Sequence, residues 1–198
     1  MSLRVLAGAA QASSALSGPA LDAAVAALPP TGRVARAWAV LGTVLDPEVP
    51  ALSVCDLGIV RDVIEESDGL QIVLTPTYSG CPATEVIVHD VIAAIDAAGL
   101  GPARVTLQRA PAWTTDWISE QGRRKLFDYG IAPPGPVEAA RDDGAVPIRF
   151  FNRSVERLAC PRCGSRNTER LSAFGSTACK ALHRCLACGE PFEHFKPI

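Results

Sequence analysis

Two Cys-x-x-Cys pairs constrain the fold of this chain more than any other feature. The first pair is Cys160 and Cys163, and the second, after 21 intervening residues, is Cys185 and Cys188. Two residues between the cysteines of a pair let both sulfurs turn toward one point, so each pair can hold one edge of a tetrahedral metal site. A glycine directly follows each pair, where a tight turn favours a positive φ. The spacing predicts a zinc ribbon in which all four thiolates bind the metal.

The seven cysteines could alternatively form disulfides in a secreted protein, so the compartment has to be inferred from the rest of the chain. Residues 1–27 carry one basic side chain, Arg4, and no sustained apolar core, which makes them a poor signal peptide. No run of about eighteen apolar residues predicts a membrane span. We therefore expect a cytoplasmic protein that does not contact a membrane and keeps its thiols reduced.

The length of 198 residues accommodates one ordinary core and a small metal-bound module. We expect a flexible, Ala-rich tail over 1–30, an α+β domain over 31–131, a Pro-rich linker over 132–147 and the ribbon over 148–198. Residues 1–147 carry 10 Lys and Arg against 17 Asp and Glu, whereas the ribbon carries 9 against 4. Because a linker of this composition makes few contacts, we expect the acidic domain and the basic ribbon to fold separately.

The apolar periodicity of the front domain predicts helices and strands in alternation. The predicted elements are a helix over 34–45, strands over 60–64 and 70–75, a helix over 82–98, a strand over 104–109 and a helix over 119–129. Asp68-Gly69 is a hairpin signal between the first two strands, and Gly99 is a helix stop. The fold class is therefore α+β, with a small sheet covered by helices and followed by the ribbon.

Cys81 stands where a strand is expected to end and a helix to begin. Pro82 suits the first helical position and so places Cys81 at or next to the helix N-cap, where backbone N–H groups and the helix dipole favour a thiolate. An isolated cysteine is more often a small buried residue. The flanking Gly80 and Pro82 nevertheless indicate a shaped loop, so we interpret Cys81 as a reactive or metal-binding thiol.

Acidic residues precede Cys81 in two segments of the front domain. Asp46, Glu48 and Asp56 could supply oxygen ligands, but each could equally accept backbone hydrogen bonds in a turn. Together with Cys81 they belong to three motifs: Asp46-Pro-Glu-Val-Pro50, Ser53-Val-Cys-Asp-Leu-Gly-Ile-Val60 and Thr75-Pro-Thr-Tyr-Ser-Gly-Cys-Pro-Ala-Thr84. Over about residues 34–110, these motifs resemble the iron–sulfur cluster assembly family that includes SufT. The resemblance implies that Cys81 is the functional thiol, supported by Asp46, Glu48, Asp56 and Thr84, and that it holds iron or an iron–sulfur cluster transiently.

Further motifs resemble the PaaD family, a component of the 1,2-phenylacetyl-CoA epoxidase system, over about residues 34–198. They are Pro111-Ala-Trp-Thr-Thr-Asp-Trp117, Tyr129-Gly-Ile-Ala-Pro-Pro134, Phe174-Gly-Ser-Thr-Ala-Cys-Lys180 and Glu190-Pro-Phe192. The resemblance implies a non-catalytic accessory of a multicomponent oxygenase in aerobic phenylacetate degradation. Its partners would be the oxygenase and reductase subunits, whose iron or iron–sulfur centres it helps to assemble. The chain itself has no paired di-iron motif, no Gly-x-Gly-x-x-Gly run and no Walker loop.

Several alternatives stay open at this point. The ribbon could be a nucleic-acid-binding or interaction module, with Phe174 stacking on bases. Its basic residues would be Arg153, Arg157, Arg162, Arg166, Arg170, Lys180 and Arg184. Because the acidic front domain would repel phosphate, nucleic acid is the less favoured partner. A thiol oxidoreductase is weaker still, since Cys81 has no Cys-x-x-Cys partner.

Cys179 is a fifth cysteine near the ribbon motif. It could be a small buried residue, a spare thiol or an additional ligand, and spacing alone does not distinguish zinc from an iron–sulfur cluster. The sequence also leaves open a homodimer through the N-terminal domain and the identity of the partner in the epoxidase system.

Overall fold

The computed structural model describes residues 31–78, 80–135 and 158–198. The predicted tail, most of the predicted linker, and the basic residues Arg153 and Arg157 lie outside these ranges. Gly32–Ile198 is one compact unit, and every helix and strand below belongs to it. Within the described ranges, no helix has the length and apolar character needed to cross a bilayer.

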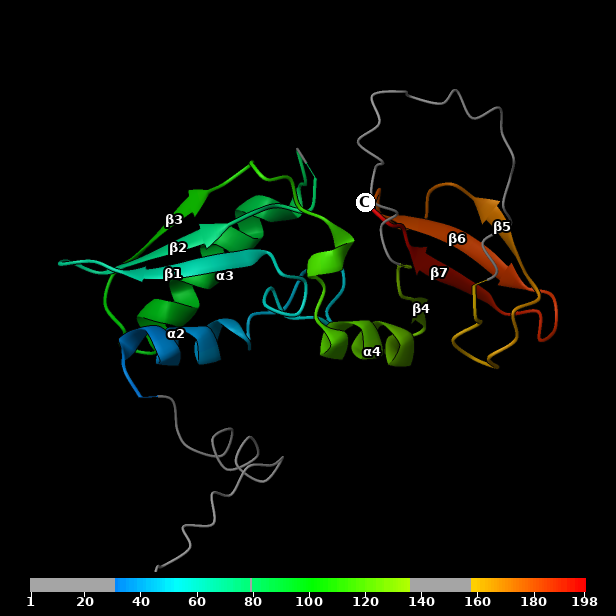
Figure 1. The fold of residues 1–198 in the computed structure, drawn as a ribbon, viewed down its shortest axis with the longest axis horizontal. Coiled ribbons are helices and arrows are strands. Elements are labelled where there is room, and N and C mark those ends of the chain that lie inside the picture. The colour runs from blue at the N-terminus through cyan, green and yellow to red at the C-terminus, as the bar shows by residue number, and fades with distance from the viewer. Residues whose placement is uncertain (1–30, 79, 136–157) are drawn as a thin grey trace, which may run out of the picture. The chain divides into compact units, whose positions relative to one another are not determined.

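A three-stranded sheet organises the front domain (Figure 1). Strands β1 (Val60–Glu65) and β2 (Leu70–Leu74) form an antiparallel hairpin, and β2 pairs in parallel with β3 (Ala103–Leu107). The parallel pairing requires a crossover, which helix α3 (Ala83–Ala97) provides. The predicted strands, hairpin and α+β class are confirmed.

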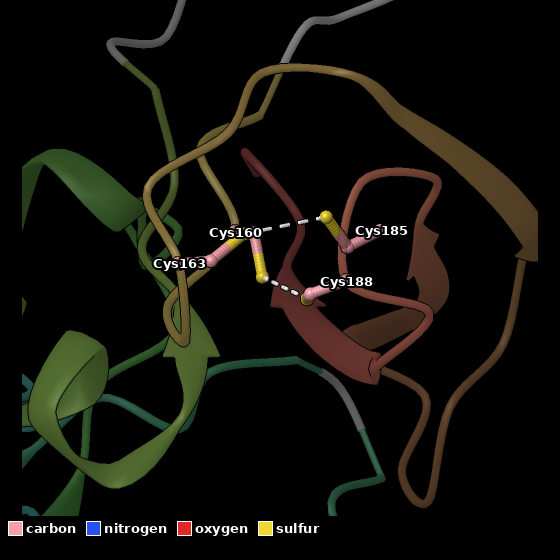
Figure 2. A group of neighbouring side chains, drawn as sticks. All are labelled: Cys160, Cys163, Cys185 and Cys188. Atoms are coloured by element: carbon pink, nitrogen blue, oxygen red, sulfur yellow. Dashed lines mark hydrogen bonds between the residues drawn. The ribbon is translucent and has the colours of Figure 1, made fainter.

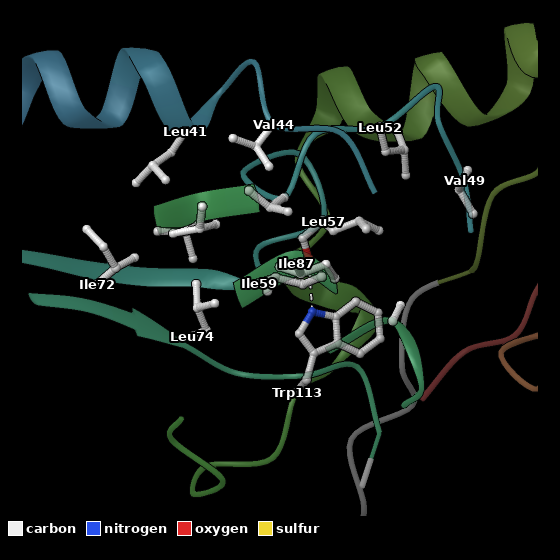
Figure 3. Packing of buried hydrophobic residues seen from close by; sticks show 14 of the residues in the cluster. Leu41, Val44, Val49, Leu52, Leu57, Ile59, Ile72, Leu74, Ile87 and Trp113 are labelled. Carbon is white, nitrogen blue, oxygen red and sulfur yellow. Dashed lines mark hydrogen bonds between the residues drawn. The ribbon is translucent and has the colours of Figure 1, made fainter. Parts of the chain in front are cut away.

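Helices α2 (Arg33–Leu41) and α3 contact each other and pack on the sheet, α2 against β1 and α3 against β3. Figure 3 shows side chains from the helices, the strands and the intervening loops meeting in one core. Fully buried members of this core include Leu41, Leu52, Ile72, Leu74, Val91 and Ile95. Of the apolar positions predicted to face inward, Leu41, Ile87, Val91 and Ile95 are buried, whereas Trp38, Leu45 and Val86 are exposed.

The boundaries of the two helices differ in part from the prediction. Helix α2 ends at Leu41 and not at residue 45, because the backbone turns at Gly42 and Leu45 instead forms an isolated β-bridge with Ser53. Helix α3 has Pro82 as its N-cap residue, so Cys81 lies one position before the cap. Its C-terminal stop is as predicted, since Gly99 follows with a φ of +66°.

The chain then forms a short 3-10 helix, η1 (Thr115–Trp117), and helix α4 (Glu120–Tyr129). The Ser119 side chain caps α4 by accepting a hydrogen bond from the Gly122 N–H at 2.8 Å. Helix α4 confirms the predicted helix over 119–129. The 3-10 helix has no counterpart among the predicted elements.

The ribbon forms a second sheet with the order β4-β7-β6-β5. Its strands are β4 (Ile131–Ala132), β5 (Thr168–Ser172), β6 (Lys180–Cys185) and β7 (Pro191–Phe195). Strand β4 pairs in parallel with β7, whereas the other pairs are antiparallel. Ala132, at the start of the predicted linker, is thus a buried strand residue. The sheet and its cysteines confirm the predicted ribbon.

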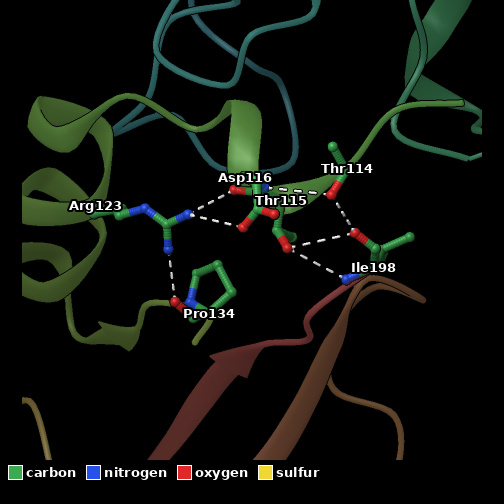
Figure 4. A network of polar contacts seen from close by, with 6 residues as sticks. All are labelled: Thr114, Thr115, Asp116, Arg123, Pro134 and Ile198. Carbon is green, nitrogen blue, oxygen red and sulfur yellow. Dashed lines mark hydrogen bonds and ion pairs between the residues drawn. The ribbon is translucent and has the colours of Figure 1, made fainter. Parts of the chain in front are cut away.

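The ribbon also contacts the front domain. Phe195 belongs to the core of the front domain, and its ring centroid lies 6.1 Å from that of Trp113. The Ile198 backbone oxygen accepts hydrogen bonds from the Thr115 N–H at 3.1 Å and the Thr114 hydroxyl at 2.8 Å (Figure 4). Arg123 reinforces this corner by donating to the carbonyl oxygens of Thr115 and Pro134. A linker rich in proline does not prevent such packing, because the contacts come from the strands that follow it.

Candidate metal and thiol sites

The four paired cysteines converge on one point of the ribbon (Figure 2). Their sulfurs all lie within 4.8 Å of one another. The Sγ atoms of Cys160 and Cys188 are 3.8 Å apart, and those of Cys163 and Cys185 are 3.6 Å apart. A tetrahedron with metal–sulfur bonds of about 2.3 Å has edges of about 3.8 Å. The four cysteines therefore form a metal-binding cluster whose dimensions fit a tetrahedral ion.

Both cysteine loops use the same backbone pattern. The N–H of Gly164 donates to the Cys160 carbonyl at 2.8 Å, and the N–H of Gly189 donates to the Cys185 carbonyl at 2.9 Å. Both glycines have the predicted positive φ, at +72° and +78°. Hydrogen bonds from the backbone N–H groups of Cys188 and Ala187 lower the pKa of the Cys185 thiol to about 6. The loops thus supply backbone donors to thiolates, as a metal-binding cysteine requires.

Cys81 lies in a turn between β2 and α3. Its N–H donates to the Tyr78 carbonyl at 3.3 Å, and the Thr84 N–H donates to the Cys81 carbonyl at 3.1 Å. Gly80 has a φ of +85°, a conformation that L side chains rarely adopt. The half-buried Cys81 packs against the front-domain core. The predicted shaped loop is therefore present, and Thr84 contributes to it through its backbone.

Tyr78 connects Cys81 with an acidic residue from another loop. Burial and the nearby charges of Cys81 and Glu48 raise the pKa of Tyr78 to about 12. Of the predicted supporting residues, Glu48 is thus close enough to act electrostatically on this turn.

The loop of Glu48 is shaped by Asp46. The buried Asp46 carboxylate accepts hydrogen bonds from the N–H groups of Glu48 at 2.9 Å and Val49 at 2.7 Å. Burial raises the pKa of Asp46, and burial together with the charge of Asp46 raises the pKa of Glu48. Asp46 therefore positions the loop, whereas the side chain of Glu48 remains available.

Asp56 makes different contacts from the other predicted acidic residues. Its Oδ2 accepts from the Ser53 N–H at 2.9 Å, the Ser53 hydroxyl at 2.8 Å and the Lys125 ammonium at 2.7 Å. Burial alone would raise the pKa of Asp56, but these donors lower it below its ordinary value. Asp56 thus links its own turn to helix α4.

Cys179 does not belong to the four-cysteine cluster. It is buried in the core of the front domain, and its sulfur lies 3.0 Å from the Thr177 hydroxyl. Burial and the charge of Glu48 raise the pKa of the Cys179 thiol. Sequence analysis missed this location, because the ribbon motif placed Cys179 with the other ribbon cysteines.

Lys180 corrects the picture of a basic ribbon surface. Its side chain is 4% exposed, and its Nζ lies 2.9 Å from Glu193 Oε2. Lys180 also acts electrostatically on Asp46 and Glu48, across the contact between ribbon and front domain. A groove of about 470 Å³ lies beside Glu48, Lys180 and Glu193. Lys180 is therefore a buried ion-pair residue. The nucleic-acid alternative required it to be free to bind phosphate, and it is not.

Two family models match separate parts of the chain. Residues 34–107 match a model described as iron–sulfur cluster assembly protein, and residues 147–196 match one described as PaaD zinc beta ribbon domain. The first range contains Cys81 and the second contains the four-cysteine cluster. Each candidate site therefore lies in a segment with its own family match.

Related proteins extend these matches to most of the chain. A protein from Porphyromonas gingivalis (strain ATCC BAA-308 / W83) named Fe-S protein maturation auxiliary factor is 34% identical over 43% of this chain and 83% of its own length. A solved domain of unknown function, DUF59 from Bacillus anthracis, covers 48% of this chain and 91% of its own length with 28% identity and a TM-score of 0.44. A protein from Escherichia coli (strain K12), whose name assigns it to 1,2-phenylacetyl-CoA epoxidase, is 45% identical over 84% of this chain and 94% of its own length. Because the chain spans nearly all of that relative and carries the PaaD ribbon, it belongs to the PaaD family of 1,2-phenylacetyl-CoA epoxidase components.

Proposed function

We propose that the chain is a non-catalytic accessory of the phenylacetyl-CoA epoxidase system and assists the assembly of iron or iron–sulfur centres in its partner subunits. The name of the Escherichia coli relative supports the association with the epoxidase. The names of two shorter relatives, both Fe-S protein maturation auxiliary factors, support the maturation role. The oxygenase and reductase subunits are the partners in this proposal.

One observation carries the maturation role: the half-buried Cys81 thiol in its glycine-shaped turn. Its backbone hydrogen bond to Tyr78, and the charge of Glu48 that acts on Tyr78, place the thiol in a polar turn within the assembly-protein segment. A thiolate and a carboxylate can both bind iron, and Cys thiolates hold iron–sulfur clusters. Iron or a cluster at Cys81 is in this proposal the cargo that passes to a partner.

The ribbon has a structural part in the proposal. In this proposal, zinc joins the two cysteine loops, Cys160 with Cys163 and Cys185 with Cys188, and so stabilises the second sheet. The zinc is structural and not catalytic, because its closed four-thiolate shell leaves no position for a substrate. The sheet then presents its outer surface to one of the partners. Both Cys81 and this outer surface belong to the same compact unit, Gly32–Ile198.

Substitution of Cys81 by serine tests the proposal. Serine is nearly isosteric, so Cys81→Ser should keep the melting temperature and the ribbon metal while it abolishes growth on phenylacetate and leaves co-expressed partner subunits short of iron. Cys55→Ser is the matched control, since Cys55 is also a half-buried cysteine of the front domain. Burial and the charge of Asp56 raise the pKa of Cys55 to about 11, which makes it a poor thiolate.

Normal iron and normal growth with Cys81→Ser would contradict the maturation role. A loss of stability without a change in partner iron would instead assign Cys81 a structural role. The accessory role has a separate test, because the purified chain supplied with reductant and oxygen should not convert phenylacetyl-CoA to an epoxide.

A further inference from the structure

The groove of about 470 Å³ is lined by residues of both the ribbon and the front domain. Glu48 lines it from the loop after α2, Tyr129 from the end of α4, and Leu182 and Phe192 from strands β6 and β7. All of these residues belong to the compact unit Gly32–Ile198. Ligand pockets usually measure about 300–1,000 Å³, so the groove is large enough for a ligand or for side chains of a partner.

One charged pair in the lining is already neutralised. The Lys180 side chain is 4% exposed, and its Nζ lies 2.9 Å from Glu193 Oε2. The other carboxylate oxygen of Glu193, Oε1, accepts a hydrogen bond from the Ser176 N–H. Because opposite charges at such a distance largely cancel for a third group, Lys180 and Glu193 make the groove polar without giving it a net charge.

Glu48 supplies the net charge of the lining, which has two carboxylates against one ammonium. Within the described ranges, the Glu48 carboxylate accepts no hydrogen bond and lies in no ion pair. Its backbone is nevertheless fixed, because the Glu48 N–H donates to the buried Asp46 carboxylate at 2.9 Å. An ordered loop therefore presents one unpaired carboxylate to the groove, and this charge favours a cationic occupant.

The rest of the lining favours a cation with a long apolar stem. Tyr129 is 57% exposed, although it is a large aromatic side chain, and Phe192 and Leu182 line the same groove. An arginine lays its aliphatic stem along apolar surface, stacks its guanidinium on aromatic rings and pairs with a carboxylate through two hydrogen bonds. Tyrosine and arginine are also the side chains that most often dominate the energy of protein interfaces.

We infer that this groove docks an arginine of a partner protein together with its flanking apolar residues. The guanidinium pairs with the Glu48 carboxylate, and the stem lies against Tyr129. This inference rests on the proposed function, which supplies the partners, the oxygenase and reductase subunits. Because the groove is lined by both the front domain and the ribbon, its occupant also stabilises the contact between them.

The affinity of the full, zinc-loaded chain for the purified oxygenase and reductase subunits tests the inference. Glu48→Gln should weaken binding to the docking subunit by about thirty-fold or more, the lower end for truncation of one partner of a buried charge pair. Glu48→Lys should abolish binding, and Tyr129→Ala should weaken it by at least about ten-fold. Glu120→Gln is the control, since Glu120 is 79% exposed on α4 and lies outside the groove, and it should bind as the wild type does.

A measurement on the wild type avoids dependence on the fold of a variant. Binding of the subunit should slow amide exchange at residues 129–131 and in the turn of Ser176, and should leave the hairpin of β1 and β2 unchanged. Wild-type affinity in Glu48→Lys and Tyr129→Ala, or protection confined to other segments, would overturn the inference and leave the proposed function in place. Failure of the wild type to bind either subunit would also overturn it. The proposed function fails separately, if Cys81→Ser leaves the iron of the partner subunits unchanged.

Discussion

The chain contains two cysteine sites that are built in opposite ways. In the ribbon, two short loops bring four sulfurs within 4.8 Å of one another, and each loop contributes a complete edge of the site. At Cys81, a glycine-shaped turn presents one thiol, and the adjacent Tyr78 is influenced electrostatically by Glu48 and by Cys179, which comes from the ribbon. The first site depends on local chain geometry, and the second depends on how the ribbon packs on the front domain.

This difference suggests a division of roles between the two sites. A preformed four-thiolate shell binds its metal tightly and contributes directly to folding. A site assembled by packing changes its geometry whenever the packing changes, so a partner that moves the ribbon could alter binding at Cys81. In the proposed function, cargo is then bound and released at Cys81 without a change in the structural metal.

Loss of the ribbon metal should have the largest effect. Cys160→Ser removes one of four ligands, and structural zinc binding contributes about 10–16 kcal/mol in isolated fingers. We expect the metal to be lost and strands β5, β6 and β7 to lose amide-exchange protection. Because Phe195 packs in the front-domain core, the melting temperature of that domain should fall as well. Exchange protection by mass spectrometry and metal analysis measure both effects.

If the front domain and the ribbon fold independently, as the composition of the linker suggested, the result is different. In that case Cys160→Ser would leave the protection of β1, β2 and α3 unchanged. Cys55→Ser is the control, and it should keep both the metal and the protection of the ribbon strands. An unfolded ribbon beside an unaltered front domain would show that the packing contacts carry little energy.

Truncation of Phe195 should separate packing from metal binding. Phe195 is 2% exposed, and its ring lies against Trp113, so Phe195→Ala should cost about 3–5 kcal/mol of unfolding free energy. The four-cysteine cluster should keep its zinc. Denaturant unfolding and metal analysis measure the two effects. Phe174→Ala, at a residue that is 65% exposed, is the control and should stay within about 0.5 kcal/mol of the wild type.

Features that depend on neighbouring residues could be predicted from the sequence, whereas features that depend on distant segments could not. The hairpin at Asp68-Gly69, the stop of α3 at Gly99 and the ribbon cluster depend on neighbouring residues, and all three are confirmed. The end of α2 was wrong, because the apolar pattern continues to Leu45 although the backbone turns at Gly42. Burial was one of the alternatives for Cys179, but its place in the core of the front domain could not be predicted, since the residues of that core come from segments far away in the sequence.

Removal of the charge partner of Lys180 should have an intermediate effect. Glu193→Gln leaves a buried ammonium without its carboxylate, and the loss of a charged hydrogen bond costs about 2 kcal/mol. The ribbon zinc should be unchanged. Glu190→Gln is the control. Glu190 Oε2 lies 4.0 Å from Nε of the exposed Arg162, and such exposed pairs contribute about 0–1 kcal/mol to the free energy of unfolding. Equal unfolding free energies for the two variants would mean that the Lys180 pair does not stabilise the contact.

The smallest expected effect is on the acid sensitivity of the ribbon. It distinguishes the contribution of a buried histidine of the sheet from that of the metal-binding thiolates. His194 on β7 is 2% exposed, and burial together with the charge of His183 lowers the pKa of its imidazole to about 4. Its Nε2 has no hydrogen-bond partner within the described part of the chain. The unfolded chain, with an imidazole pKa of about 6.5, therefore takes up a proton before the folded chain does. The contribution of the neutral His194 to the free energy of unfolding is therefore fully present above about pH 6.5, and it is lost progressively as the pH falls toward about 4.

Between pH 8 and pH 5.5 the loss of stability from His194 should be about 1.4 kcal/mol. His194→Phe keeps a ring beside His183 and should remove this part of the pH dependence when zinc is saturating. His89→Gln, at a side chain that is 81% exposed, should retain the wild-type pH profile. Unfolding free energies of the three proteins at both pH values decide the matter, and identical profiles would assign the acid sensitivity of the ribbon to its thiolates alone.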